Sequence, residues 1–168
     1  MSGSVNLWLH LLAFATYGGA TLALLLISLP AARRQEEPEQ RQRYAADVMR
    51  VYDPLTIAAL GVLVMTGAFN LTAYKAALQN LFFDRLGVLL AWKLFFTFLL
   101  INLAAYVAFG LGHRLVRSVD SEQPVDASWV DGLLRRLRIS ASLALVLIAV
   151  IVWLALRMTH PGLPSAPA

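Results

Sequence analysis

Four long runs of apolar residues constrain the fold of this chain more than any other feature of its sequence. They cover about residues 5–30, 54–74, 87–112 and 138–157. A helix needs roughly 20 apolar residues to cross about 30 Å of hydrocarbon, and each run has that length. Only 14% of the residues are charged, whereas about 25% are charged in a typical soluble domain. The sequence therefore predicts an all-α, integral membrane four-helix bundle, which forms a single four-span domain in a lipid bilayer.

Proline and glycine residues mark the expected ends of these runs. Asp53 and Pro54 have the pattern of a helix start, with Asp53 as the N-cap and Pro54 at the first helical position. Gly110 and Gly112 mark the expected end of the third helix. The Pro- and Ala-rich residues 161–168 predict an irregular tail after the fourth.

The segment just before the fourth run predicts a short amphipathic helix at the membrane interface. Residues 130–138 place arginines on one face and Leu133, Leu134 and Leu137 on the other. We expect this segment to lie at the lipid surface and to lead into the fourth span.

The distribution of basic residues predicts the orientation of the bundle. The connections between spans one and two and between spans three and four hold ten of the 14 Lys and Arg residues: Arg33, Arg34, Arg41, Arg43, Arg50, Arg114, Arg117, Arg135, Arg136 and Arg138. The positive-inside rule places both connections in the cytoplasm and both termini on the outer, periplasmic side of a bacterial-type inner membrane. The net charge of +4 is thus explained by topology, and nucleic-acid binding is excluded.

Several classes of function require residues that the sequence does not have. The chain has no cysteine, which excludes disulfide scaffolds, thiolate metal sites, iron–sulfur clusters and a cysteine nucleophile. It has no phosphate loop, Ser-His-Asp pattern or metalloprotease motif, which argues against a hydrolase or an ATPase. All ten acidic residues are expected in loops or at the ends of spans, which argues against a relay of carboxylates within the membrane.

His10 is the leading candidate for a binding residue. It lies roughly 8 Å into the first span from the outer side, at 1.5 Å per helical residue. An ionisable side chain inside a membrane helix is costly, so a functional or pairing role is expected. A neutral imidazole is also a common ligand of haem iron and transition metals. The alternative is an interfacial histidine that forms hydrogen bonds to lipid headgroups or to a neighbouring helix.

Further candidates lie toward the same outer end of the bundle. Lys93, the only charge within the third span, either pairs with an anion such as a haem propionate or extends to the interface beside Trp92. Met65 offers a thioether to haem iron or copper, although methionine also fills space in a core. His160 is a further imidazole. Tyr17 begins a Tyr-Gly-Gly sequence that allows the close approach of a helix or a flat cofactor.

Two segments carry a resemblance to a known family. The first span contains LWLHLLAFATYGGATLALLLISLPAARR and the third contains WKLFFTFLLINLAAY. They resemble helices of the copper-resistance D (CopD) membrane domain and of its relative, the HemJ-type protoporphyrinogen oxidase. The resemblance implies haem b binding, porphyrinogen oxidation or copper uptake, with His10 and Lys93 matching the family's histidine and lysine. HemJ-type proteins have further histidines near that lysine, where this chain has Ala91, Asn102 and Leu103.

From these residues we expect a CopD/HemJ-like membrane protein that binds haem b and serves electron transfer or porphyrin redox chemistry. His10 would be one axial ligand. Met65 or His160 would be the second, or the haem would be five-coordinate with no second ligand. If the protein is an enzyme, it is an oxidoreductase. One alternative is an accessory subunit that packs against other membrane subunits or forms a homo-oligomer. The other is copper import or tolerance, with His10 and the methionines as the pathway.

Overall fold

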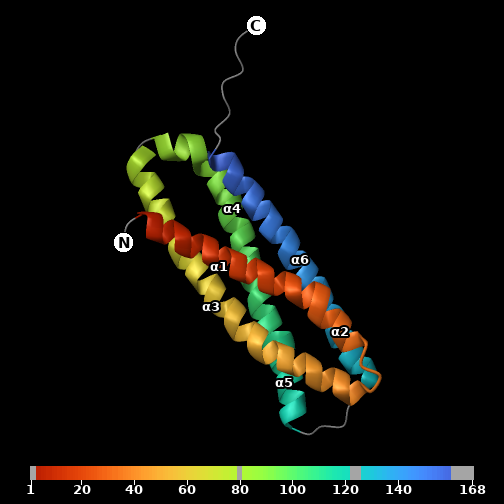
Figure 1. The fold of residues 1–168 in the computed structure, drawn as a ribbon. Helices are drawn as coiled ribbons and strands as arrows, with labels where there is room; N and C mark the ends of the chain where they lie inside the picture. The colour runs from red at the N-terminus through yellow and green to blue at the C-terminus, as the bar shows by residue number, and fades with distance from the viewer. Residues whose placement is uncertain (1–2, 79–80, 122–125, 160–168) are drawn as a thin grey trace.

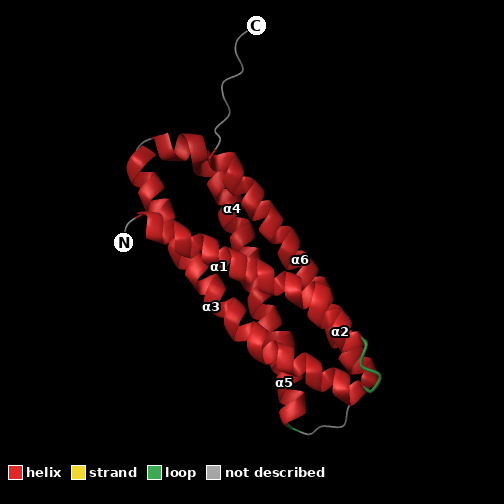
Figure 2. Ribbon diagram, viewed as in Figure 1, coloured by secondary structure: helices red, strands yellow, loops and turns green. Residues whose placement is uncertain are grey.

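The computed structural model describes residues 3–78, 81–121 and 126–159, and they form four long helical runs (Figures 1 and 2). The first run consists of α1 (Gly3–Ala23), the π-helical η1 (Leu24–Ser28) and α2 (Leu29–Arg33). The second run is α3 (Pro38–Leu78). The third consists of α4 (Leu81–Ala105), the π-helical η2 (Tyr106–Gly112) and α5 (His113–Asp120), and the fourth is α6 (Ala127–Thr159). The described residues contain no strand, so the predicted all-α four-helix bundle is confirmed.

Each run includes a segment that is long and apolar enough to cross a membrane, so the chain is a multi-pass membrane protein. These segments are Gly3–Arg33, Pro38–Thr72, Gly87–Asp120 and Ala127–Met158. Large apolar side chains such as those of Trp8, Val88 and Phe109 point away from the bundle and are more than two-thirds exposed. Such a surface suits lipid tails, and helices satisfy their own backbone hydrogen bonds there.

The four runs form a ring in which neighbouring helices are antiparallel. α1 packs mainly on α3, and α4 packs mainly on α6, with further contacts between α3 and α4 and between α1 and α6. The start of α1, the end of α3, the start of α4 and the end of α6 lie at one end (Figure 1). We call this the His10 end. The opposite end, formed by α2, the start of α3, α5 and the start of α6, is the Arg-rich end.

The buried apolar core lies in the middle of the bundle and at its Arg-rich end. One cluster, in the middle, includes Tyr17, Leu100 and Ile148. A second cluster at the Arg-rich end includes the fully buried Met49 and Leu134. Neither cluster includes a residue of the first three turns of α1. The His10 end therefore depends on other contacts to hold its helices together.

α3 continues through the Asp53-Pro54 pair, so the prediction of a helix start there is wrong. Pro54 lies inside the helix. The prediction that every acidic residue lies in a loop or at the end of a span is also wrong for Asp53, which lies within α3. Pro54 costs one backbone hydrogen bond, which membrane helices tolerate when local hydroxyls and packing compensate. The carbonyl that loses its usual partner is that of Arg50, four residues before Pro54, whereas the Thr56 hydroxyl donates to the Tyr52 carbonyl at 2.7 Å. Before Pro54, α3 also buries Met49 in the core at the Arg-rich end.

The third run also continues past Gly110 and Gly112, where its end was predicted. These glycines lie in η2, and the helix goes on as α5 to Asp120. A Cβ atom at Gly112 would collide with the carboxylate of Asp53. Gly112 therefore allows a close approach between η2 and α3 and does not end the helix.

Residues 130–138 do not form a separate interfacial helix, because they are part of α6. Val130, Leu133, Leu134 and Leu137 are all buried in the core cluster of the Arg-rich end. The lengthened α3 and α5 supply the apolar partner that the sequence did not reveal.

α6 begins beside Asp126, whose Oδ1 accepts hydrogen bonds at 2.8 Å from the Ser128 hydroxyl and backbone N–H. These bonds hold the pKa of Asp126 below its usual range because they stabilise its charged form.

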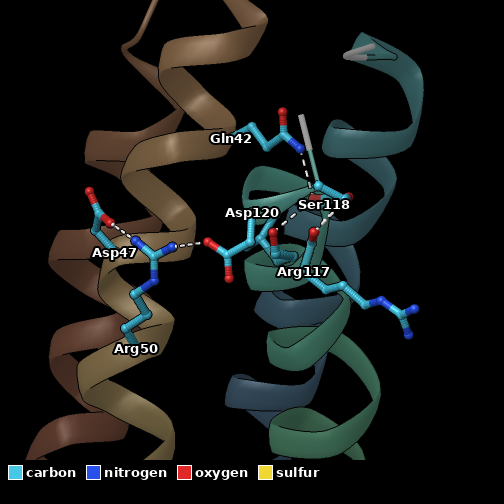
Figure 3. A network of polar contacts seen from close by, with 8 residues as sticks. Gln42, Asp47, Arg50, Arg117, Ser118 and Asp120 are labelled. Carbon is cyan, nitrogen blue, oxygen red and sulfur yellow. Dashed lines mark hydrogen bonds and ion pairs between the residues drawn. The ribbon is translucent and has the colours of Figure 1, made fainter. Parts of the chain in front are cut away.

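Polar contacts between α3 and α5 add to this core at the Arg-rich end (Figure 3). The buried Gln42 amide donates to the Ser118 hydroxyl at 2.7 Å. Arg50 forms ion pairs with Asp47 at 2.7 Å and with Asp120 at 2.5 Å. Both carboxylates are more than half exposed, and exposed ion pairs contribute only about 0–1 kcal/mol each. The apolar core therefore stabilises this end more than its ion pairs do.

Replacing Leu134 tests whether residues 130–138 are core or interface. Leu134→Ala should lower the free energy of unfolding by about 2–5 kcal/mol, because it opens a cavity in a packed core. Denaturant titration in detergent micelles measures the change. Ile139→Ala is the control, since Ile139 is on the same helix and is 60% exposed. Equal effects of the two substitutions would contradict the core assignment.

Candidate functional site

The ring of His10 is held by a hydrogen bond between α1 and α3. His10 Nδ1 lies 2.8 Å from Thr66 Oγ1. The Thr66 hydroxyl itself donates to the Val62 carbonyl at 2.6 Å. Because a hydroxyl has only one proton to donate, this geometry favours the tautomer in which His10 Nδ1–H donates to Thr66 Oγ1, and the ring also interacts with the Leu63 backbone. In that tautomer a neutral ring keeps its lone pair on Nε2, the arrangement of a histidine that can bind a metal or haem iron.

Asn6 and Asn70 extend this contact toward the His10 end of the bundle. The Asn6 amide donates to the Thr66 carbonyl at 3.1 Å and to Asn70 Oδ1 at 2.7 Å. We call Asn6, His10, Thr66 and Asn70 the α1–α3 polar cluster. Asn6 and Thr66 are buried. Such interhelical hydrogen bonds join helices where both lipid and helix surface are apolar.

Three members of this cluster, Asn6, Thr66 and Asn70, were not predicted from the sequence. The available signal was their spacing, because Asn6 and His10 are four residues apart, as are Thr66 and Asn70. Residues four apart lie on one face of a helix. Two asparagines within apolar spans, each one turn from another polar residue, thus indicate a polar contact between helices.

Lys93 of α4 lies within electrostatic reach of His10. Its side chain is half-buried. None of the ion pairs between described residues includes Lys93. The two sequence candidates with ionisable side chains, His10 and Lys93, thus interact electrostatically between α1 and α4, and the ammonium group has no acidic partner among the described residues.

The remaining candidates are not brought to His10. Met65 is 63% exposed, although its neighbour Thr66 faces α1. Trp92 is exposed on α4, where its ring stacks on that of Phe96 with the centroids 5.9 Å apart. Tyr17 is buried seven residues further along α1, or roughly 10 Å along the helix axis. His160 and the predicted tail at 161–168 lie outside the described residues.

The described ionisable side chains around His10 are one imidazole and one ammonium group, that of Lys93. A bare zinc or copper ion needs three or four protein ligands. No three His, Cys, Asp or Glu side chains converge on a metal-sized site within the part of the chain that the structure describes. Haem iron is coordinated by its porphyrin and needs one or two side chains. The arrangement can therefore provide one axial imidazole and a nearby cation.

Comparison with known proteins adds no relative from which a function could be carried over. No family model, curated protein or solved structure matches this chain. The side chains around His10 and Lys93 are therefore the basis for inferring a function.

Thr66→Val tests the inferred proton position on His10. Valine keeps the shape but removes the acceptor, so the ring should lose its preference for a proton on Nδ1. Nitrogen chemical shifts of histidine-labelled protein, assigned with His10→Gln, measure that preference. Thr72→Val is the control, because the exposed Thr72 hydroxyl bonds only to its own helix. A His10 signal unchanged by Thr66→Val would show that the hydrogen bond does not set the tautomer.

Proposed function

We propose that this chain is a CopD/HemJ-like protein of a bacterial-type inner membrane that binds haem b for electron transfer or porphyrin redox chemistry. The observation that carries the proposal is the His10–Thr66 hydrogen bond, which holds Nδ1 of His10 against α3. If the chain acts as an enzyme, the chemistry is that of an oxidoreductase.

Three residues at the His10 end support this proposal. His10 would hold the iron through Nε2, and Thr66 would fix the ring by accepting its Nδ1 proton, as outer-shell partners of metal-bound histidines do. Lys93 would hold a propionate, since its ammonium has no acidic partner among the described residues. Haem iron supplies one-electron chemistry when bound.

The structure supports the copper alternative less well. A Cu(I) pathway needs soft or imidazole ligands in sequence along one route. Met65 is exposed on α3, while Thr66 and His10 face each other between α1 and α3. The two side chains therefore do not form a common site for copper.

A spectrum of the purified protein tests the proposal. Protein purified in detergent from haem-replete cells should show a Soret band, and reduction with dithionite should sharpen its α-band. His10→Ala should remove or shift these bands, because it removes the ligand. Thr66→Val should weaken haem binding by about 10- to 100-fold, the usual effect of losing an outer-shell partner.

His113→Ala is the matched control, because His113 is an exposed histidine at the other end of the bundle. It should leave the spectrum unchanged. A colourless wild-type protein, or a His10→Ala spectrum identical to that of the wild type, would overturn the haem proposal. Co-purification of other chains with colourless protein would favour the accessory-subunit alternative.

A further inference from the structure

Asp53 places a carboxyl group inside the bundle, between α3 and η2. Its Oδ1 atom is buried and has no hydrogen-bond partner. Its other oxygen lies where a Cβ atom at position 112 would collide with it, so the carboxyl is seated directly against Gly112. None of the ion pairs between described residues includes Asp53.

No cation neutralises this carboxyl from the helices packed around it. Tyr52, its neighbour on α3, interacts with it electrostatically and carries a neutral phenol. η1 has no titratable residue, and α1 contributes the buried Tyr17. The titratable side chains of η2, the start of α5 and the facing part of α6 are all exposed: Tyr106, His113, Arg114, Arg135, Arg136 and Arg138.

Three departures from regular α-helix lie around Asp53. Pro54 interrupts the hydrogen bonds of α3. The π-helical segments η1 and η2 both contact α3. π-Helical segments are rare and occur frequently at functional sites. The geometry of three helical runs is therefore altered near the half-buried side chain of Asp53.

A small cavity lies beside Tyr52, the residue before Asp53. The hydroxyl groups that line it belong to Tyr17, Tyr52, Thr56 and Ser140. Its volume is about 10 Å³, close to what one water molecule requires. The Tyr52 hydroxyl also lies 3.3 Å from Thr21 Oγ1. Residues with hydroxyl groups thus lie next to Asp53 on α3 and toward the middle of the bundle.

We propose that Asp53 is a proton-binding site. Its carboxylate takes one proton from water at the Arg-rich end, which the positive-inside rule assigns to the cytoplasm, and is held against Gly112 as the neutral acid. Asp53 is half-buried, and a carboxylate with one buried, unpartnered oxygen atom is disfavoured, whereas the acid carries no charge. Arg50, roughly one helical turn earlier on α3, is exposed and pairs with the exposed carboxylates of Asp47 and Asp120, so the charged groups of the Arg-rich end reach to within one turn of Asp53. This site is independent of haem at His10.

Infrared spectroscopy of the full chain in lipid vesicles tests the proposal. At neutral pH the wild type should show a protonated-carboxyl C=O band that shifts in D2O. Asp53→Asn, which has nearly the same shape as the neutral acid, should lose this band and still fold. Asp47→Asn is the control, since Asp47 is exposed on the same helix, and it should keep the band. Absence of the band in the wild type, or its persistence in Asp53→Asn, would overturn the proposal.

Thermal unfolding gives a second and separate measurement. A group held protonated in the folded state stabilises the protein at low pH, and this contribution is lost as the pH rises through its folded pKa. The wild-type midpoint should therefore fall with rising pH, and that fall should be absent from Asp53→Asn. Repeating the titration with choline in place of sodium distinguishes a proton bound at Asp53 from a sodium ion bound there. A dependence on sodium at constant pH would overturn the assignment to a proton.

Discussion

Hydrogen bonding of the backbone inside a bilayer is the constraint on which the rest of this structure depends. Without water, every N–H and C=O must be satisfied within the chain, and continuous helices achieve this. The constraint explains why α3 passes through Pro54 and why the third run passes through Gly110 and Gly112 without ending. It also means that polar side chains in the spans must find their partners on neighbouring helices.

Different kinds of contact hold the helices together at the two ends of the bundle. At the Arg-rich end the helices extend past the apolar runs and bury Met49 and Leu134 in a core, as in a soluble helical bundle. At the His10 end α1 and α3 are joined by polar contacts, from Asn6 to Thr66 and from His10 to Thr66. Polar contacts of this kind orient side chains more precisely than apolar packing does. They therefore suit a site that must hold a ligand.

The two proposed sites lie at different levels of α3. Thr66, which orients His10, and Asp53 are 13 residues apart in the sequence, or roughly 20 Å along the helix. The middle core cluster, including Tyr17, Leu60 and Leu100, lies between them. A haem at the His10 end and a proton site toward the Arg-rich end would therefore lie in separate parts of the bundle. Tyr17 and Tyr52 line the small cavity at the edge of that core.

The sequence by itself determined the four spans, the all-α class and the candidates His10 and Lys93, because long apolar runs and ionisable exceptions to them are visible without coordinates. It did not determine how each helix is rotated about its axis. Lipid and core are both apolar, so hydropathy does not distinguish an inward face from an outward one. Only the tertiary structure decided that Thr66 faces His10 while Met65 does not, that Leu134 is core, and that Asp53 is seated on Gly112. Each of these depends on which residues of distant helices meet, and neither spacing nor composition specifies that.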